Sequence, residues 1–375
     1  NIFGIKCQKY CVRFLNQRSN IHPNQISLFD PLKDRGFIER ENRMLRHIYN
    51  NIISIENLLL SWREFLRGKK KRKDVAEFSV NFMDNIFMLH RELSEKTYKH
   101  GGYQAFKISD PKPRDIHKAS VRDRLVHHAI YRIMYPYFDR KFIFDSYSCR
   151  IGKGTHKAIY RLRHFGRIVS QNNTRTCWIL KCDIQKFFAN INHEILKDIL
   201  EKYIGDEDAL WLFSQVIDSF NTKDKNRVGL PLGNLTSQLL VNIYMNELDH
   251  FIKRELKMEF YIRYADDFVI LHEDKAYLEK IIPEISRFLE TKLRLSLHPN
   301  KVFIKTLASG TDFLGWVNFS KHRILRTSTK KRMMKKLKKN PKPESISSYM
   351  GMLSHGNTQK LYEEIEEIEK HLQNS

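Results

Sequence analysis

The sequence of 375 residues lacks several features that would define its class at once. No uninterrupted apolar run approaches the roughly 18 residues that a membrane helix requires, and no secretory signal is visible. The chain has only five cysteines, and no second Cys or His pair completes a zinc-binding pattern. It also lacks internal repeats and long low-complexity tracts. We therefore expect a globular cytoplasmic protein with free thiols and no membrane association.

The chain is also poor in acidic residues. It has 43 Asp and Glu residues against 66 Lys and Arg residues, a net charge of +23. A charge of this sign and size indicates a polyanionic partner, most simply a nucleic acid. The alternative is a solvated basic surface with no specific partner. Hydrophobic residues make up 41% of the chain, enough for two or three packed subdomains.

Against this basic background, two adjacent carboxylates stand out in the tetrad Tyr264 to Asp267. Apolar, β-favouring residues flank them on both sides, a pattern that predicts a strand, a tight turn and a second strand. Adjacent carboxylates repel each other unless a cation offsets their charge. Oxygen ligands on one turn suit Mg²⁺, although a polar hairpin turn is the simpler alternative.

A third acid, Asp183, ends the strand-like segment from Trp178 to Ile184. A carboxylate at the end of a buried strand is costly unless it binds something. Two-metal phosphoryl or nucleotidyl transfer requires carboxylates that converge from separate elements. Asp183 would then join Asp266 and Asp267, whereas its alternative role is that of a helix N-cap.

Hydrophobic periodicity predicts most of the remaining elements. Helices are expected within residues 46–100, 118–140, 193–220, 230–253, 278–289 and 330–339, and short strands at 103–108 and 178–184. Pro283 is expected to interrupt its helix or to mark its first turn. The basic run from Gly68 to Lys73 is expected to be a solvated loop or a contact for template phosphates.

Several motifs in order resemble the reverse transcriptases of bacterial retroelements, over about residues 50–365. Asp183 with Phe187 and Phe188 is similar to the first palm motif of that family, and Tyr264–Asp267 is similar to the second. Leu295–Lys301 resembles the motif that follows, and Phe313–Trp316 resembles the primer grip turn.

The resemblance implies an α+β right-hand polymerase fold with fingers, an antiparallel palm sheet and a helical thumb. It places an N-terminal extension at 1–48, fingers with part of the palm at 49–175, the palm at 176–318 and the thumb at 319–375. It implies two Mg²⁺ ions, which Mn²⁺ can replace. Their ligands would be Asp183, Asp266, Asp267 and the backbone carbonyl near Ile184.

The resemblance also implies roles for other side chains. Lys301 would assist departure of pyrophosphate, and Phe188 would exclude a ribose 2′-OH. Gly233 and Gln238 would lie beside the nascent base pair. Basic residues would contact the triphosphate of the incoming dNTP: Lys112, Arg114 and Arg150. The implied partners are template RNA, a primer or cDNA, and dNTPs.

The segment Gly229–Gln238 bears on the subclass. Its Gly-Asn-x-x-Ser-Gln form resembles the error-prone reverse transcriptases of diversity-generating retroelements. Related unknown-group enzymes that act in phage defence share much of the same palm and fingers. A group II intron enzyme is the third alternative, which the lack of a recognisable endonuclease segment after the thumb disfavours. An oligomeric accessory protein or a second defence subunit is the corresponding expected partner.

Two alternatives lie outside templated synthesis. An RNA-binding scaffold with a vestigial site would have lost at least one acid, and none of the three is substituted. A terminal transferase or protein-primed polymerase would use the same palm chemistry. Tyr10 or Ser19 in the N-terminal arm would then be a conceivable primer.

Overall fold

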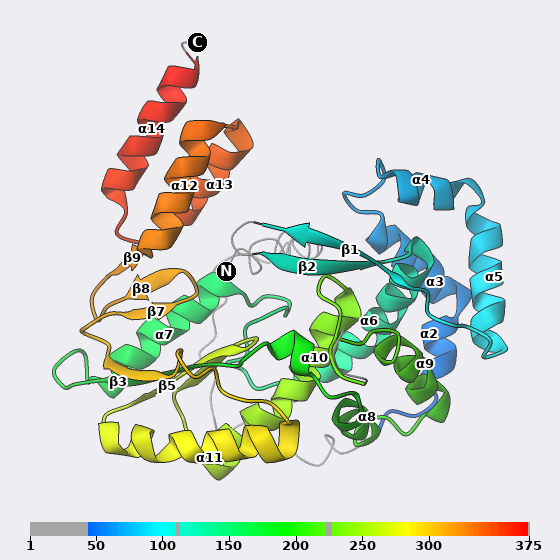
Figure 1. The fold of residues 1–375 in the computed structure, drawn as a ribbon, viewed down its shortest axis with the longest axis horizontal. Coiled ribbons are helices and arrows are strands. Elements are labelled where there is room, and N and C mark those ends of the chain that lie inside the picture. Colours follow the sequence, from blue (N-terminus) through cyan, green and yellow to red (C-terminus); the bar gives the residue numbers. More distant parts are fainter. Residues whose placement is uncertain (1–43, 110–112, 223–226, 374–375) are drawn as a thin grey trace, which may run out of the picture.

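The computed structural model describes residues 44–109, 113–222 and 227–373. Helices, a hairpin, an antiparallel sheet and a separate C-terminal group of helices follow one another along the chain (Figure 1). This order confirms the expected α+β class. Tyr10, Ser19 and Lys112 lie outside the described residues, as does most of the expected extension 1–48.

The first part of the described chain is mainly helical. Its helices are α2 (Tyr49–Ile53), α3 (Ile55–Phe65), α4 (Lys73–Val80), α5 (Phe82–Ser94), α6 (Val121–Lys141) and α7 (Thr155–Val169). A hairpin of β1 (Tyr103–Ile108) and β2 (Arg114–Ala119) lies between α5 and α6. Ser120 accepts a hydrogen bond from the backbone N–H of Asp123 and thereby caps the start of α6.

The central part is an antiparallel sheet with strand order β4-β5-β3-β6. Its strands are β3 (Trp178–Asp183), β4 (Tyr261–Tyr264), β5 (Asp267–His272) and β6 (Phe303–Thr306). The helices of this part are η3 (Phe187–Asn190), α8 (His193–Glu201), α9 (Glu207–Ile217), α10 (Leu235–His250), η4 (Phe251–Glu255) and α11 (Lys275–Leu293).

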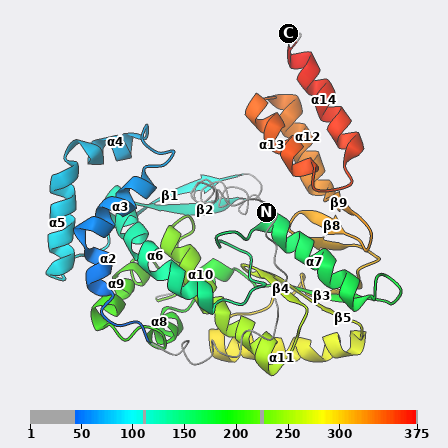
Figure 2. The same cartoon turned by 180° about the vertical axis from the view of Figure 1, so that it is seen from behind.

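The two faces of the sheet bury different side chains, because successive residues of a strand point to opposite faces. On β3, Leu180 and Cys182 belong to the core that includes α10 and α11. Ile179 belongs to the second core, which includes buried residues of α7. Figure 2 shows α7 and α11 on different sides of the strands. Asp183 and Lys181 share the face of Ile179, at the end of the strand.

The C-terminal part contains the small sheet of β7 (Thr311–Phe313), β8 (Trp316–Asn318) and β9 (Arg323–Leu325). The helices α12 (Thr327–Lys339), α13 (Pro343–Leu353) and α14 (Gln359–Gln373) follow it. They stand apart from the rest of the chain in both views (Figures 1 and 2). Gly356, between α13 and α14, lies so close to Trp316 that an added Cβ would be 2.1 Å from the indole ring. This contact joins the helices to the small sheet.

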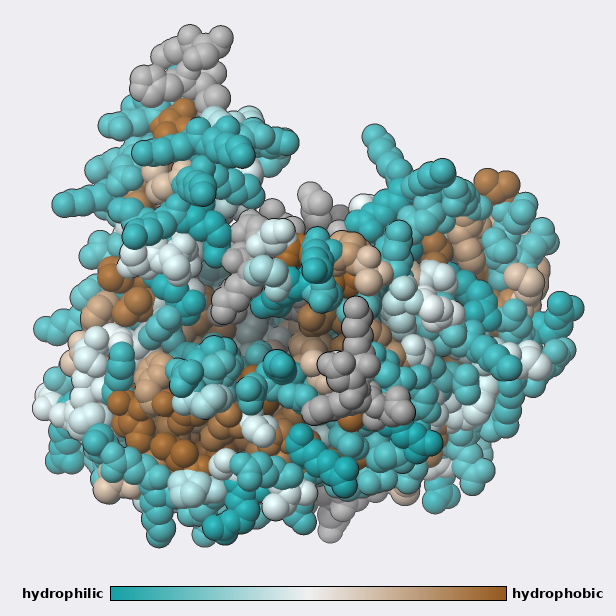
Figure 3. Space-filling model, viewed as in Figure 1, coloured by the Kyte–Doolittle hydropathy of each residue, from teal (hydrophilic) through white to brown (hydrophobic). Residues whose placement is uncertain are grey.

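The face seen in Figure 3 is mainly hydrophilic, with a hydrophobic area just above α11. None of the helices in the described ranges is both long and apolar enough to span a membrane.

Most expected elements are present, but the structure also contains elements that were not expected: α7, β2, β6 and the small sheet β7–β9. Strand β2 was not expected, because two prolines precede it in the sequence. Its buried and exposed residues also do not alternate along the strand. The expected helix at 193–220 is divided into α8 and α9, with Gly205 between them. The prediction for Pro283 was wrong, since α11 continues through it. Pro283 is exposed, so the lost backbone hydrogen bond lies on the solvent side of the helix.

Candidate active site at the end of the palm sheet

The register of the sheet brings two of the predicted acids together. Asp183 and Asp267 are direct partners across the antiparallel pair β3–β5. Side chains of such partners project from the same face with Cβ atoms about 4.5–5.5 Å apart. Like charges in this arrangement destabilise a sheet. The site therefore requires positive charge close to both carboxylates.

The third acid lies on the turn that joins β4 to β5. Tyr264 pairs with Asp267, which leaves Ala265 and Asp266 as a two-residue turn. Ala265 has φ 58°, a left-handed conformation that costs a residue with a Cβ about 1–2 kcal/mol. The backbone N–H of Ile184 donates to Asp266 O over 3.2 Å and ties the turn to the end of β3. Asp266 is thus held beside the acid pair.

Arg263 supports this turn from within the core, where its side chain is fully buried. Its Nε and one Nη donate to the two carboxylate oxygens of Asp249 over 2.7 and 2.6 Å. The other N–H groups donate to Ser146 Oγ, Asn242 Oδ1 and Ala265 O. Every guanidinium N–H thus has an acceptor. The sequence analysis missed Arg263, although a charged residue inside an apolar strand was a usable signal.

Two lysines supply the positive charge that the acid pair requires. Lys301 Nζ donates to Asp183 Oδ1 over 2.8 Å. Lys181 Nζ lies 2.8 Å from Asp267 Oδ1 and forms an ion pair with it. The angles at the two atoms do not meet the criteria for a hydrogen bond. The sequence analysis named Lys301 but missed Lys181. The signal was available, because Lys181 lies two residues before Asp183 and therefore on the same face of β3.

The carboxyl groups remain electrostatically costly despite these lysines. Burial, together with the charges of Asp183 and Asp267, raises the pKa of Asp266 to about 6. Burial also raises the pKa of Asp267, an effect that Lys181 partly opposes. Raised acid pKa values mark a site where a further cation would stabilise the ionised forms.

The segment before Lys301 is fastened to the strand that carries Asp183. His298 N donates to Asp183 O over 2.8 Å, and Gln185 N donates to Ser296 O over 2.9 Å. A bridge between Ile184 and Leu297 lies between these two bonds. The backbone of the expected motif 295–301 thus lies beside the first acid and delivers the lysine to it.

The structure places the three residues that were predicted to contact the triphosphate in different surroundings. Arg114 is half-buried on β2, and its charge acts to lower the pKa of Asp266, so it lies within electrostatic reach of the acids. Lys112 lies outside the described residues. Arg150 donates to Asp139 Oδ1 and to the carbonyls of Asp139, Ile143 and Ser146, and its contact with a triphosphate stays a prediction. These bonds give Arg150 a structural role in the loop after α6.

The predicted base-pair residues lie around the start of α10. Leu230 N donates to the carbonyl of Phe188 over 2.8 Å, so this segment touches the predicted ribose gate. Gly233 has φ 106°, and an added Cβ would lie 3.0 Å from Ile116 Cγ2 on β2. Gln238 is half-buried on α10. The segment therefore connects the aromatic Phe188 to the β1–β2 hairpin.

A second group of charges is the basic cluster Lys69, Arg72, Lys118 and Arg124, two members of which pair with the carboxylate of Asp74. Lys118 Nζ lies 2.7 Å from Asp74 Oδ2, and Arg124 pairs with the same oxygen. Burial and the charges of Arg124 and Arg72 lower the pKa of Lys69 to about 8. These cations repel one another, so the cluster favours the binding of an anion.

The cluster is connected to the acid site along one strand. Arg114 and Lys118 lie four residues apart on β2 and therefore on the same face. At a rise of about 3.3 Å per residue, their Cα atoms are about 13 Å apart. One face of β2 thus leads from the acids to the basic cluster.

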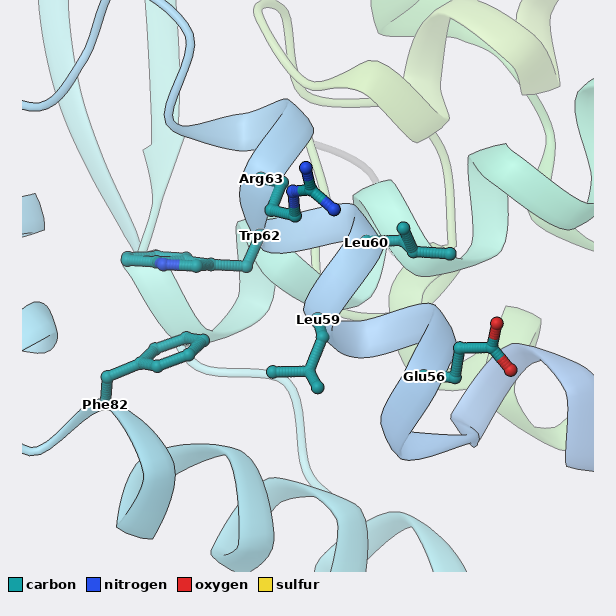
Figure 4. A pocket seen from close by; sticks show the side chains of 6 residues that line it. All are labelled: Glu56, Leu59, Leu60, Trp62, Arg63 and Phe82. Carbon is teal, nitrogen blue, oxygen red and sulfur yellow. The ribbon is translucent and has the colours of Figure 1, made fainter.

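A surface hollow between α3 and α5 carries none of the predicted site residues. Its lining is Glu56, Leu59, Leu60, Trp62, Arg63 and Phe82 (Figure 4). The rings of Trp62 and Phe82 stack with centroids 5.0 Å apart, which attaches α5 to α3. The lining is mainly apolar, with Glu56 and Arg63 as its two charged side chains.

The acids form a partial metal site. Within the described ranges, no three His, Cys, Asp or Glu side chains are already arranged around a common point for a metal ion. Two of the acids instead hold lysines. The donor set still fits Mg²⁺, since carboxylate oxygens from β3, the turn and β5 lie at one sheet end and the pKa of Asp266 is raised.

Comparisons with known proteins identify several relatives of this chain. YkfC of Escherichia coli K12 is 27% identical over 257 residues, which cover 58% of this chain and 65% of YkfC. The group II intron-encoded protein LtrA of Lactococcus lactis subsp. cremoris is 23% identical over 278 residues, which cover 56% of this chain and 45% of LtrA. The chain thus spans less than two thirds of the length of either relative.

A solved apo telomerase from Candida tropicalis is 14% identical, with a TM-score of 0.47 over 63% of this chain and 50% of its own. The sequence also matches the family described as reverse transcriptase (RNA-dependent DNA polymerase) over residues 107–318, more than half of the chain. That range contains the acids, both lysines and the segment before α10. The chain therefore belongs to the reverse transcriptase family.

Proposed function

We propose that the protein is an RNA-directed DNA polymerase that adds dNMP units to a primer 3′-OH. The observation that carries this proposal is the direct pairing of Asp183 with Asp267, with Asp266 on the adjoining turn, in a chain of this family. In each step the 3′ oxygen forms a bond to the α-phosphorus and the bond to the β-phosphate oxygen breaks. The hydroxyl proton is lost and pyrophosphate leaves.

Asp183, Asp266, Asp267 and the carbonyl of Ile184 would hold two Mg²⁺ ions. When bound, such ions lower the pKa of the primer hydroxyl and neutralise the triphosphate. Arg114 would contact the triphosphate, since it already lies within electrostatic reach of Asp266. Lys301 has an exposed stem and can move from Asp183 to a proton-accepting phosphate oxygen of the leaving group. Phe188 would exclude a ribose 2′-OH.

The test is primer extension on an RNA template with Mg²⁺ and four dNTPs. Asp266→Ala should abolish synthesis while RNA binding and the folded state are retained. Asp267→Ala should also abolish synthesis, in a protein that is less stable because Lys181 loses its ion-pair partner. Lys280→Gln on α11 is the matched control, because this exposed side chain lies away from the acids. Synthesis by either aspartate variant would disprove the assignment.

The roles of the larger regions are proposals too. Residues 49–175 would form the fingers, 176–318 the palm and 319–375 the thumb. The basic cluster on the fingers would contact template phosphates, and the many lysines of α12 would follow the duplex. We expect the protein to act in the cytoplasm.

Within the family, we propose the error-prone enzyme of a diversity-generating retroelement, on the basis of the segment Gly229–Gln238. Leu232 occupies a position where a long polar side chain would help to select the base, and its backbone carbonyl accepts from His117 N over 3.1 Å. An accessory protein is the expected partner. Sequenced products should then carry substitutions opposite template adenines, and Leu232→Gln should reduce them.

Other outcomes favour other subclasses. Repetitive products unrelated to the supplied template would favour a phage-defence enzyme. Faithful, long copies would favour an intron-type enzyme, which the similarity to LtrA supports. Each outcome is compatible with the same acids and lysines, so the sequence of the product decides between them.

A further inference from the structure

The two lysines at the acid pair differ sharply in exposure. The side chain of Lys301 is 41% exposed, whereas that of Lys181 is 8% exposed. Lys301 can therefore leave Asp183 for solvent or for a phosphate at little cost. An ammonium as enclosed as that of Lys181 has no comparable alternative.

Lys181 makes its ion pair with one carboxylate. Asp267 supplies the only ion pair of Lys181 within the described residues, and the ring of Phe303 lies 5.8 Å from its Nζ. Removing one partner of a buried ion pair leaves an uncompensated charge, which is strongly unfavourable. Lys181 is thus expected to keep Asp267 as its partner in every state of the site.

The oxygen that Lys181 holds is closed to other ligands. Asp267 Oδ1 has essentially no solvent exposure, while the side chain as a whole is 15% exposed. The accessible part of the carboxylate therefore lies on the other side, toward Oδ2. A cation that enters from solvent meets Oδ2 first.

We propose that Lys181 is a permanent counter-cation that keeps Asp267 Oδ1 and leaves Oδ2 as the single oxygen for a divalent ion. This inference rests on the proposed metal site. Lys181 acts as a positioning residue, because it prevents Asp267 from rotating or from binding the ion through both oxygens. It also lowers the negative charge of the site by one unit, which weakens cation binding.

The proposal predicts an unusual pair of effects for Lys181→Met. The variant site is one charge more negative, so it should bind Tb³⁺, used as a luminescent probe, about tenfold more tightly or better. At saturating Mg²⁺ its kcat should fall at least about tenfold, because Asp267 is no longer held in one orientation. Tighter binding with slower chemistry is not expected when a side chain only supports the fold.

Thermal unfolding gives a readout that does not depend on catalysis. In EDTA, Lys181→Met should unfold about 5 °C or more below the wild type, because Asp267 loses its partner. Addition of Mg²⁺ should raise the midpoint of the variant more than that of the wild type. Lys305→Met is the matched control, since this exposed lysine of the neighbouring strand β6 makes no ion pair in the described chain.

Lys181→Gln guards against a variant that does not fold. Glutamine retains a donor for Oδ1 without the charge, so Tb³⁺ should bind more tightly while the loss of stability is smaller. The proposal would be overturned if both variants bound Tb³⁺ no more tightly than the wild type and if Mg²⁺ raised their unfolding midpoints by the same amount as that of the wild type. Primer extension by the wild type tests the proposed function separately, and its failure would leave the binding result interpretable.

Discussion

At the scale of single residues, the site balances charge before any ion enters. The site has three carboxylates and two ammonium groups. Each lysine forms an ion pair with a different aspartate, Lys181 with Asp267 and Lys301 with Asp183. Asp266 makes no ion pair within the described residues, and its pKa is the one raised to about 6. The unpaired acid on the turn is therefore where pH should act.

The raised pKa of Asp266 predicts a pH dependence of stability in EDTA. Its folded pKa of about 6 exceeds the ordinary 3.8, so the folded state holds the proton more firmly. The contribution of Asp266 to stability should be greatest below about pH 4 and should fall by about 3 kcal/mol as the pH rises through 6 to about 7. Urea unfolding of the wild type and Asp266→Asn at pH 4 to 7 measures the difference.

Asp266→Asn should lack this pH-dependent loss, and a divalent cation should reduce it in the wild type. Equal pH profiles for the two proteins in EDTA would contradict the assignment of the raised pKa to Asp266.

Arg263 predicts a large effect on stability. Arg263→Met leaves Asp249 charged and buried without its partner, which should cost about 3–5 kcal/mol in urea unfolding. The matched control is Arg175→Met, whose exposed ion pair with Glu273 should contribute less than about 1 kcal/mol. A loss below 1 kcal/mol for Arg263→Met would show that water or another group replaces the guanidinium.

At the scale of elements, the site depends on how the hairpin β1–β2 meets the start of α10. Asn234 Nδ2 donates to His117 O over 3.0 Å, and His117 N donates to Leu232 O. This pair of bonds fixes the loop before α10 against β2. Gly233 lies between the two bonded residues, where only a residue without a Cβ meets both the φ of 106° and the contact with Ile116.

Gly233→Ala should therefore displace β2 from the loop. We expect a loss of about 1–3 kcal/mol in stability from the backbone strain, and a raised KM for dNTP because Arg114 moves with the strand. Gly102→Ala is the control, since an added Cβ there meets nothing within 4 Å. Equal effects of the two substitutions would show that the contact with Ile116 does not matter.

The sequence could predict the elements that depend on local pattern. The strand around Asp183, the acid turn and the basic helix α12 follow from apolar periodicity and turn residues, and the structure contains all three. It could not predict that Arg150 is taken up by Asp139 and nearby carbonyls, because those contacts depend on how the chain folds back. Nor did periodicity alone assign Lys181 to Asp267, since that pairing depends on the register of β3 with β5.

At the scale of the whole molecule, most of the excess of Lys and Arg over Asp and Glu lies in the sequence before β3. The basic cluster includes Lys118, which lies near the end of β2 and close to the start of α6. Its distance of about 13 Å from Arg114 along β2 corresponds to a few nucleotides of single strand. This separation is the basis for the proposed contact of the cluster with template phosphates.

Replacing Lys69 and Lys118 by Gln should weaken binding of primer–template with a long 5′ template overhang. Each lost phosphate contact should reduce the slope of log affinity against log salt by about 0.7 for single strands. Binding of a blunt-ended duplex should change little, and fluorescence anisotropy over a salt series measures both. Equal losses for blunt and overhanging substrates would place the cluster elsewhere on the nucleic acid.

The bonds of Arg263 also bear on when activity can appear during synthesis of the chain. Ser146 and Arg263 are 117 positions apart, and Lys301 and Asp183 are 118 apart. A growing chain that ends before Lys301 cannot close the second pair, and one that ends before Arg263 cannot fix the turn. Incomplete chains on the ribosome are thus expected to lack an assembled acid site until both distant partners have been made.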